Sequence, residues 1–255
     1  MDTELTDSVL SAAELVARSE RIVVLTGAGI STDSGIPDFR GPNGLWTRDP
    51  EAEKASHIDS YLSDPMVRRR NWARRADGSL WADVEPNDGH RALVALQERG
   101  SLHTLITQNV DELHQRAGIH IERVIEIHGT TRKAACLGCA YRVEMEVVLE
   151  RVRSGEPDPD CPGCGGILKS ATISFGQSLV AEDLMRAQAA AESCDLLLAV
   201  GTSLGVYPIA NVVPVAARSG ADVVIVNAEP TPFDALAAAV VQGSISEVLP
   251  VICGA

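Results

Sequence analysis

Aromatic residues and long apolar runs are scarce in this 255-residue sequence. Phe, Trp and Tyr together make up 4% of it, and it contains no stretch of about 18 apolar residues, the length a membrane-spanning helix needs. The segment from Met1 to Glu20 has neither a basic start nor an apolar run, so it resembles neither a secretory signal nor a transit peptide. We therefore expect a cytoplasmic protein that does not enter a membrane.

Positive charge is also in short supply. Lys and Arg number 22 against 35 Asp and Glu, which gives a formal net charge of −13. No basic face can dominate such a surface, and this argues against a nucleic-acid partner. The apolar and charged fractions are those of an ordinary globular protein, and the length suits one large domain or a large and a small one.

Short apolar runs recur along the chain, each suited to a strand buried on both faces. They lie at 21–25, 102–107, 123–127, 195–200 and 222–226. Segments with helical spacing lie before or between them, at 6–19, 89–99, 181–193 and 208–218. Strands that alternate with helices predict an α/β fold with a Rossmann-like, doubly wound parallel sheet.

Six cysteines occur, and four of them form two C-x-x-C pairs: Cys136 with Cys139, and Cys161 with Cys164. Four thiolates at this spacing can hold one structural Zn²⁺ in a closed tetrahedral site. The alternative, two redox-active pairs, would normally adjoin a strand–helix junction, and the spacing favours zinc. Cys194 and Cys253 lie in apolar stretches and are predicted to be core residues.

Two segments interrupt the strand–helix alternation. Residues 41–88 show no buried-strand signal, although 62–75 could form one or two short helices, and 134–170 hold the cysteine pairs. We predict that both are insertions into the α/β domain. The predicted domains are a Rossmann-like domain formed by 1–41, 86–133 and 171–255, a cofactor loop and helical insert at 42–85, and a zinc-binding module at 134–170.

The segment Gly27-Ala28-Gly29-Ile30-Ser31 follows the first predicted strand and precedes a predicted helix start. Glycines at such a turn let backbone amides approach a diphosphate at a helix N-terminus. The dinucleotide fingerprint is incomplete, however, because Thr32 stands in place of its third glycine and no acidic residue follows about twenty residues later at a strand end. A tight turn without a ligand explains the motif equally well.

From Arg21 to Leu249 the sequence resembles the sirtuin family, motif by motif and in the family's order. The motifs are Gly27 to Ser31, Ser34-Gly35-Ile36-Pro37-Asp38-Phe39-Arg40-Gly41, Thr107-Gln108-Asn109-Val110-Asp111, His128-Gly129, Phe175-Gly176-Gln177, Gly201-Thr202-Ser203-Leu204 with Val206 and Pro208, and Val226-Asn227. Two positions depart from the family pattern: Gln177 replaces the usual glutamate, and Ser174 is smaller than the usual aromatic residue.

This resemblance implies an enzyme, an NAD-dependent protein-lysine deacylase that uses NAD as co-substrate and carries a structural Zn²⁺. In the family mechanism the acyl-lysine carbonyl oxygen attacks the ribose C1′ as nicotinamide leaves. A histidine then acts as general base on the ribose hydroxyls, and the 2′-oxygen attacks the imidate. The products are free lysine, nicotinamide and 2′-O-acyl-ADP-ribose, and the expected partners are acyl-lysine proteins or peptides.

The resemblance also assigns roles to individual residues. The catalytic residues would be His128 and Asn109. Cofactor contacts are expected from Gly27, Ala28, Gly29, Ser31, Asp38, Phe39, Arg40, Gln108, Asn109, Val110, Asp111, Gly201, Thr202, Ser203, Asn227, Ala228, Glu229 and Ile245. Substrate contacts are expected from Ile173, Phe175, Gly176, Asn71 and Arg74. Several of the cofactor residues follow predicted strands, where parallel sheets bind ligands.

Taken alone, these residues allow plainer interpretations. A single histidine at a strand end is usually structural, although His128, with an ordinary pKa of about 6.5, could take a proton at cellular pH. Asn109 and Asp111 could simply cap a helix at 112–116. The whole-protein alternatives are an ADP-ribosyltransferase that uses the same NAD site, a hydride-transferring oxidoreductase, and a zinc-ribbon binding module.

The segment from Val67 to Arg75 resembles the helical insert of the sirtuin subclass that includes mitochondrial desuccinylases and their lipoamidase-like relatives. Desuccinylases carry a Tyr-x-x-Arg pair there that holds an acyl carboxylate. Asn71 stands at the tyrosine position and Arg74 at the arginine position. We therefore expect deacetylation with at most a modest preference for succinyl or glutaryl lysine, unless these arginines form a solvated helix face.

Overall fold

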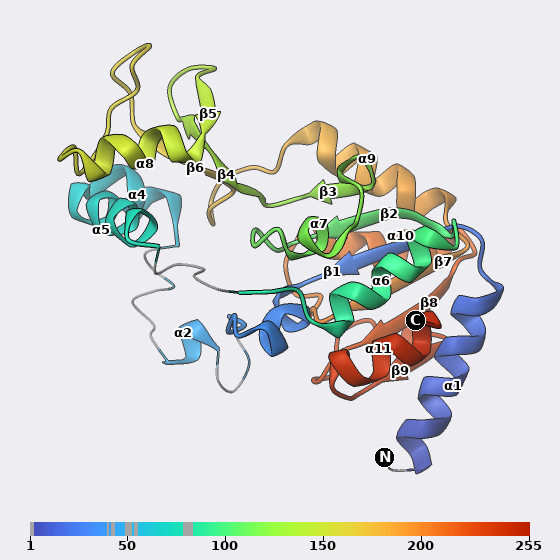
Figure 1. Cartoon of the computed structure of the whole chain (residues 1–255). Helices are drawn as coiled ribbons and strands as arrows, with labels where there is room; N and C mark the ends of the chain where they lie inside the picture. The colour runs from blue at the N-terminus through green and yellow to red at the C-terminus, as the bar shows by residue number, and fades with distance from the viewer. Residues whose placement is uncertain (1–2, 40, 42–43, 49–52, 54–55, 79–83) are drawn as a thin grey trace. The chain divides into compact units, whose positions relative to one another are not determined.

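The computed structural model describes residues 3–39, 41, 44–48, 53, 56–78 and 84–255. The chain divides into two compact units (Figure 1). The first comprises Met1–Asp38, Glu85–Ile127 and Val180–Ala255, and the second comprises Phe39–Val84 and His128–Leu179. In the described part of the chain, no helix has the length and apolar character needed to cross a membrane.

A parallel sheet forms the centre of the first unit. Its strands are β1 (Ile22–Thr26), β2 (Leu102–Thr107), β3 (Val124–Glu126), β7 (Leu196–Val200), β8 (Asp222–Val226) and β9 (Ala239–Val241). They lie in the order β3-β2-β1-β7-β8-β9, and every neighbouring pair is parallel. Numbered along this unit the order is 3-2-1-4-5-6, that of the Rossmann fold. The predicted fold class is thereby confirmed; β9 is the one strand of this sheet that the sequence analysis did not predict.

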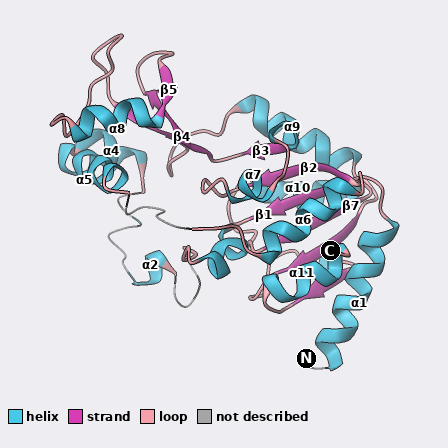
Figure 2. Ribbon diagram, in the orientation of Figure 1, coloured by secondary structure: helices cyan, strands magenta, loops and turns pink. Residues whose placement is uncertain are grey.

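Helices cover both faces of this sheet (Figure 2). They are α1 (Thr3–Arg18), α6 (Asp88–Glu98), α7 (Leu113–Ala117), α9 (Ala181–Ser193), α10 (Val212–Arg218) and α11 (Ile245–Cys253), with short 3-10 turns η1 (Ala28–Ser34), η2 (Ile121–Arg123), η3 (Ile209–Asn211) and η4 (Asp234–Leu236). Helices α1, α6 and α11 pack together over one face, and α9 packs against α10 over the other. The apolar periodicity of α1 places Val9, Ala12 and Val16 in the same core as strands β1, β7 and β8.

The second unit joins the two predicted insertions. It contains an antiparallel sheet in the order β5-β4-β6, formed by β4 (Gly129–Cys136), β5 (Arg142–Glu144) and β6 (Leu168–Thr172). Its helices are α2 (Leu45–Arg48), α4 (Ile58–Ser63), α5 (Pro65–Ala76) and α8 (Met145–Arg153). Trp72 of α5 is 1% exposed and lies in one cluster with Val148 of α8 and Leu168 of β6. The helical insert and the cysteine segment therefore share a core, and residues 128–133 and 171–179 belong to this unit because β4 and β6 pair there.

Candidate functional site

Three glycines bring the ends of β1 and β7 into contact, at the point where the strand order reverses. The Gly27 amide donates to the Val200 carbonyl at 3.0 Å, and the Gly29 amide donates to the Gly201 carbonyl at 2.9 Å. A Cβ on Gly27 would lie 2.7 Å from the Gly201 oxygen. A bound diphosphate and a tight turn without a ligand were equally good explanations of these glycines from the sequence. The close backbone approach by itself requires glycine here, and the Gly29 amide is already engaged.

Polar side chains converge beside this turn. Ser31, on η1, donates its hydroxyl proton to Asp111 Oδ2 at 2.7 Å. Asn109 follows β2, is 9% exposed, and donates from Nδ2 to Ser31 Oγ at 3.2 Å and to the Gly27 carbonyl at 3.1 Å. The structure thus brings together three predicted site residues from segments about 80 positions apart.

Asp111 has two functions in this cluster. Its Oδ1 accepts a hydrogen bond from the Leu113 amide at 3.0 Å, at the start of α7, while Oδ2 accepts from Ser31. The helix-capping interpretation therefore holds for Asp111 but not for Asn109, whose amide points toward the glycine turn. Burial raises the pKa of Asp111, and the hydrogen bonds from Leu113 and Ser31 partly oppose that shift.

Asn87, His90 and His114, which were not predicted as site residues, lie beside this cluster. Asn87 and His90 form a capping box at the start of α6, and Asn87 Nδ2 also donates to the Ile30 carbonyl at 2.8 Å. The rings of His90 and His114 lie 5.0 Å apart, and His114 Nε2 is 2.9 Å from Thr26 Oγ1. The signal that could have revealed them is Asn87-x-x-His90, a cap residue with its partner three positions later.

Both histidines are held neutral. Burial lowers the pKa of His90 to about 4, with a smaller contribution from the charge of Arg91. Burial also lowers the pKa of His114 well below its usual value, and His90 adds to the shift. An uncharged imidazole can donate one hydrogen bond and accept another. This suits rings that lie among the polar side chains of Asn87, Ser31 and Thr26.

Most of the remaining predicted cofactor residues of the first unit follow strands at the same edge of the sheet. Asp38 is the last residue of the unit's first segment and is half-buried. Gln108 Nε2 donates to Thr202 Oγ1 at 2.9 Å, which links the ends of β2 and β7. Asn227 follows β8 and donates from Nδ2 to the Glu229 carbonyl at 2.7 Å. Half-buried or exposed residues of this set are Ala28, Asp38, Gln108, Val110, Ser203, Asn227, Ala228 and Glu229. Ile245 instead is buried where α11 begins.

In the second unit, His128 immediately precedes β4 and is half-buried. Its carbonyl accepts a hydrogen bond from the Ile173 amide at 2.7 Å. Gly129 has a φ of 76°, and a Cβ there would lie 2.1 Å from the Ala171 carbonyl oxygen. The glycine after His128 is therefore required by the close approach of β6.

Aromatic rings connect two predicted contact residues in this unit. Phe39, 41% exposed, lies 4.8 Å from Trp46 between ring centroids, and Trp46 lies 5.2 Å from Phe175. The Phe175 carbonyl accepts from the Ile58 amide at 2.9 Å. Arg40 lies outside the described residues.

The four paired cysteines lie together, with their sulfur atoms within 4.8 Å of one another. Cys136 Sγ is 3.5 Å from Cys164 Sγ, and Cys139 Sγ is 3.6 Å from Cys161 Sγ. Tetrahedral Zn–S bonds of about 2.3 Å place neighbouring sulfur atoms about 3.8 Å apart, so the quartet fits one Zn²⁺. The Gly138 amide donates to Cys136 Sγ at 3.2 Å and lowers the pKa of that thiol to about 7, which favours the thiolate a metal needs.

Comparison with known proteins tests the resemblance to sirtuins over most of the chain. The model of the Sir2 family matches residues 27–208. The chain belongs to the Sir2 family. The NAD-dependent protein deacetylase 2 of Streptomyces coelicolor is 50% identical to this sirtuin over 91% of the chain and 95% of the relative. The NAD-dependent protein deacylase 2 of Archaeoglobus fulgidus is 40% identical over 96% and 95%.

Solved Sir2 structures also superimpose closely on this sirtuin. One Sir2 enzyme structure has a TM-score of 0.86 and 39% identity, covering 97% of each chain. A Sir2 structure bound to a propionylated peptide has a TM-score of 0.82 and 32% identity, covering 94% of this chain and 95% of the other.

The position where this sirtuin carries Gln177 instead of glutamate has a local function. Gln177 Oε1 accepts a hydrogen bond from the Ser174 amide at 2.8 Å, and the Gln177 amide donates to the Ser174 carbonyl at 3.0 Å. The two bonds close a tight turn around Gly176, whose φ is 84°. The glutamine side chain thus still accepts a hydrogen bond from the backbone of this loop.

Helix α5 of the sirtuin divides its arginines between two faces. Arg74 is exposed. Arg75 instead reaches β6, where its guanidinium donates to Ser170 Oγ at 3.2 Å. The same guanidinium donates to Asn71 Oδ1 of its own helix at 3.0 Å. Of the two predicted acyl-contact residues, Asn71 is therefore engaged by Arg75, and Arg74 lies on the solvent side.

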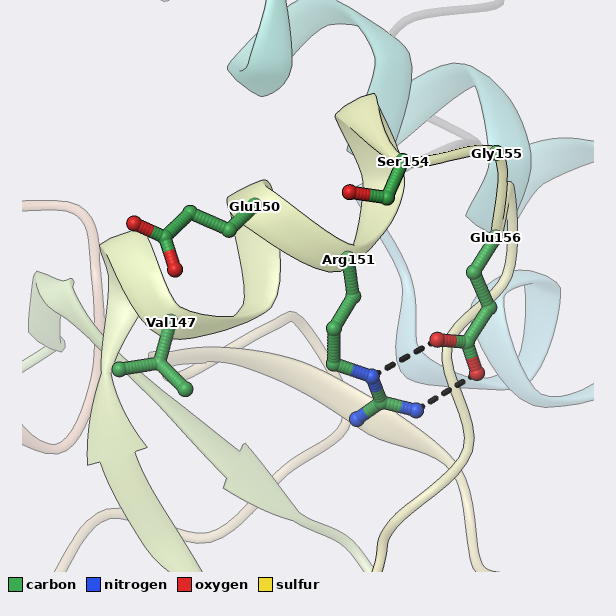
Figure 3. A pocket seen from close by; sticks show the side chains of 6 residues that line it. All are labelled: Val147, Glu150, Arg151, Ser154, Gly155 and Glu156. Atoms are coloured by element: carbon green, nitrogen blue, oxygen red, sulfur yellow. Dashed lines mark hydrogen bonds and ion pairs between the residues drawn. The ribbon is translucent and has the colours of Figure 1, made fainter.

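A hollow of about 570 Å³ lies at the end of α8, and none of its lining residues is a predicted site residue (Figure 3). Arg151 forms a two-pronged ion pair with Glu156 across it, at 2.6 and 2.7 Å, and also donates to the Asp160 carbonyl at 2.8 Å. Because Cys161 follows Asp160, this arginine fixes the approach to the second cysteine pair.

Proposed function

We propose that this sirtuin removes acyl groups from lysine side chains of proteins or peptides, with NAD as co-substrate. The observation that carries the proposal is the Ser31–Asn109–Asp111 cluster at the carboxyl edge of a sheet in Rossmann order. Membership of a family whose relatives are named NAD-dependent deacetylases and deacylases supports it. We also propose that it acts in the cytoplasm, where its cysteine thiolates would stay reduced.

The residues at the strand ends fit the parts of NAD by their chemistry. The turn at Ala28 is assigned to the diphosphate, the polar side chains after β2 to the nicotinamide ribose, and the segments 201–203 and 227–229 to the adenosine half. When bound, NAD supplies the electrophilic ribose carbon and the hydroxyl that carries the acyl group away. The chain's own residues must orient those groups and exclude water, and we assign the exclusion of water to Phe39.

We assign the proton transfer to His128 and the orientation of the ribose to Asn109. A neutral imidazole has an unprotonated ring nitrogen that can take a hydroxyl proton. Asn109 reaches the glycine turn through a buried amide, so it can hold a hydroxyl without itself titrating. The acyl-lysine peptide is assigned to Ile173, Phe175 and Gly176.

Mass spectrometry of a mixture of protein, NAD and an acetyl-lysine peptide tests the reaction class. Deacetylated peptide together with acetyl-ADP-ribose is the expected result. ADP-ribosylated protein without deacetylation would instead indicate a transferase, and NADH would indicate a dehydrogenase.

His128→Ala should abolish deacetylation, because no other group is assigned to take the ribose proton. We expect less than a tenth of wild-type turnover from a variant with an unchanged melting temperature. His120→Ala, which alters an exposed histidine beside Glu122, is the matched control and should keep full activity. A His128→Ala protein that retains more than a tenth of the turnover would show that His128 is not the general base.

A further inference from the structure

Lys169 lies on β6 and is only 4% exposed, so its amine is inside the second unit. Its Nζ donates to the Thr172 carbonyl at 2.7 Å, to Thr172 Oγ1 at 3.1 Å and to the Ser170 carbonyl at 3.4 Å. Ser170 Oγ and Thr172 Oγ1 are 2.9 Å apart, and Arg75 donates to Ser170 Oγ. A continuous hydrogen-bonded network thus runs from α5 across β6.

This network contains two cations but no acid. Among the described residues, neither Lys169 nor Arg75 forms an ion pair with a carboxylate. Burying an unpaired charge is costly, and burial together with the charge of Arg75 lowers the pKa of Lys169 to about 7. A methionine would fill the same space without this cost, so the contribution specific to lysine is its hydrogen bonds to the end of β6.

Those bonds act where the sheet is irregular. The pairing of β4 with β6 shifts register between Gly129 and Ala134, which separates the Gly129–Thr172 pair from the regular pairs at Ala134 to Cys136. Thr172 pairs with Gly129, and the next amide, that of Ile173, donates to the His128 carbonyl at 2.7 Å. The part of β6 that Lys169 fastens is therefore the part that holds the backbone of His128.

We propose that Lys169 is a positioning residue for His128: its amine fixes the Thr172 end of β6, and that end fixes the backbone at His128 and Gly129. The catalytic consequence rests on the general-base role proposed above for His128. The structural link does not, because it is made entirely of hydrogen bonds within one unit.

Hydrogen exchange tests the link without any catalytic readout. In the zinc-loaded protein, Lys169→Met should speed exchange of the Gly129 and Ile173 amides at least tenfold, while α8 and β5 keep wild-type rates. Lys133→Met is the matched control, since Lys133 is partly exposed and pairs with Glu144 at the surface. Unchanged exchange at these amides, or faster exchange throughout the unit, would overturn the proposal, because the lysine would then be irrelevant or a general core residue.

Steady-state kinetics test the catalytic consequence. Lys169→Met should lower kcat for deacetylation about tenfold or more and leave the KM for NAD unchanged, because the residues assigned to NAD at the strand ends lie in the other unit. Lys169→Arg keeps a donor and should recover most of kcat. A drop in kcat that arginine does not rescue, or no drop at all, contradicts the positioning role.

If Lys169→Met does not fold, Thr172→Val tests the same link from the other partner of the hydrogen bond. It removes the hydroxyl but leaves the carbonyl, so relative to wild type, exchange at Ile173 should rise less than tenfold and kcat should fall two- to fivefold. If wild-type protein itself does not deacetylate, the proposed function fails, whereas the exchange experiment still decides whether Lys169 fixes this backbone.

Discussion

Close backbone approach at single glycine residues decides the local geometry beside predicted site residues in each unit. Gly201 has a φ of 61°, and a Cβ there would lie 2.4 Å from the Ile30 nitrogen. Gly129 meets the same kind of limit against Ala171. In each case a glycine permits two backbone segments to touch. That contact fixes the backbone beside a predicted site residue, Ser31 near Gly201 and His128 next to Gly129.

Gly201→Ala should therefore be strongly destabilising. The left-handed conformation costs about 1 kcal/mol for alanine, and displacing the backbone of the 27–31 turn adds to it, for a total of roughly 3 kcal/mol or more. Gly220→Ala is the matched control, because Gly220 also has a positive φ of 92° but nothing lies within 4 Å of its Cβ position. Urea denaturation should show a loss of only about 1 kcal/mol for the control; equal losses in the two variants would refute the close-contact argument.

The buried histidine pair makes stability depend on pH. Because the pKa of His90 falls from 6.5 to about 4 on folding, the unfolded chain binds more protons than the folded chain between those values. Stability from this group is complete above pH 6.5 and is lost as the pH falls toward 4, by at most about 1.4 kcal/mol per pH unit.

His90→Gln should reduce that slope relative to wild type. Urea unfolding at several pH values between 6.5 and 4.5 measures it, and the comparison cancels the contribution of the carboxylates common to both proteins. Identical slopes would mean that His90 is not held neutral in the folded protein.

At the scale of elements, α5 shows how one helix serves two environments. Residues 68, 71, 72 and 75 share the face toward the core, where Trp72 is buried and Arg68 pairs with Asp158 at 2.9 Å. Arg69, Arg70 and Arg74 share the exposed face. The run of arginines in the sequence is thus both a solvated face and a set of inward anchors.

This arrangement bears on the choice of acyl group. Arg74 lies on the exposed face, and Asn71 is already bonded to Arg75. A succinyl or glutaryl carboxylate would therefore lack the hydrogen bond that a tyrosine hydroxyl gives at position 71. The loss of that bond should weaken its binding by about 0.5–1.5 kcal/mol. We expect kcat/KM values for acetyl, succinyl and glutaryl peptides within about tenfold of one another. Arg74→Met should remove any preference for the acidic chains, whereas Arg70→Met should not. A hundredfold preference for succinyl lysine would contradict this interpretation of Asn71.

At the scale of the whole molecule, each unit has a core of its own. The core of the first consists of strands and helices around the parallel sheet, and that of the second gathers Trp72, Val148 and Leu168 beside Cys136 and Cys161. A closed four-thiolate site does no chemistry and contributes its binding energy to folding. The zinc should therefore stabilise the second unit specifically.

Elemental analysis should find one Zn²⁺ per chain, and Cys136→Ser or prolonged chelation should lower that content. Hydrogen exchange should then accelerate in β4 and β6 while β1, β7 and β8 stay protected. Isothermal titration should still detect NAD binding. Freshly purified protein without zinc, or uniform loss of protection in both units, would contradict the structural role of the metal.

Sequence patterns predicted the regular elements closely. The runs at 102–107 and 222–226 match β2 and β8, and α9 spans 181–193 as predicted. The segment from Leu62 to Arg75, predicted as one or two short helices, contains the end of α4 and nearly all of α5. These elements follow from local apolar periodicity, which a single sequence displays. Strand β9 escaped notice because three residues carry too little periodicity to stand out.

The strand–helix alternation, the paired cysteines and the family motifs could be predicted without coordinates, because each consists of residues close together along the chain. Packing in three dimensions was needed to show that the glycine turn meets Gly201, that His90 lies beside Ser31 and His114 beside Thr26, that Arg75 and not Arg74 reaches β6, and that Lys169 bonds to Thr172. All but the last of these contacts join segments tens of residues apart, and side-chain direction across such distances depends on how helices and strands pack, which spacing along one chain does not encode.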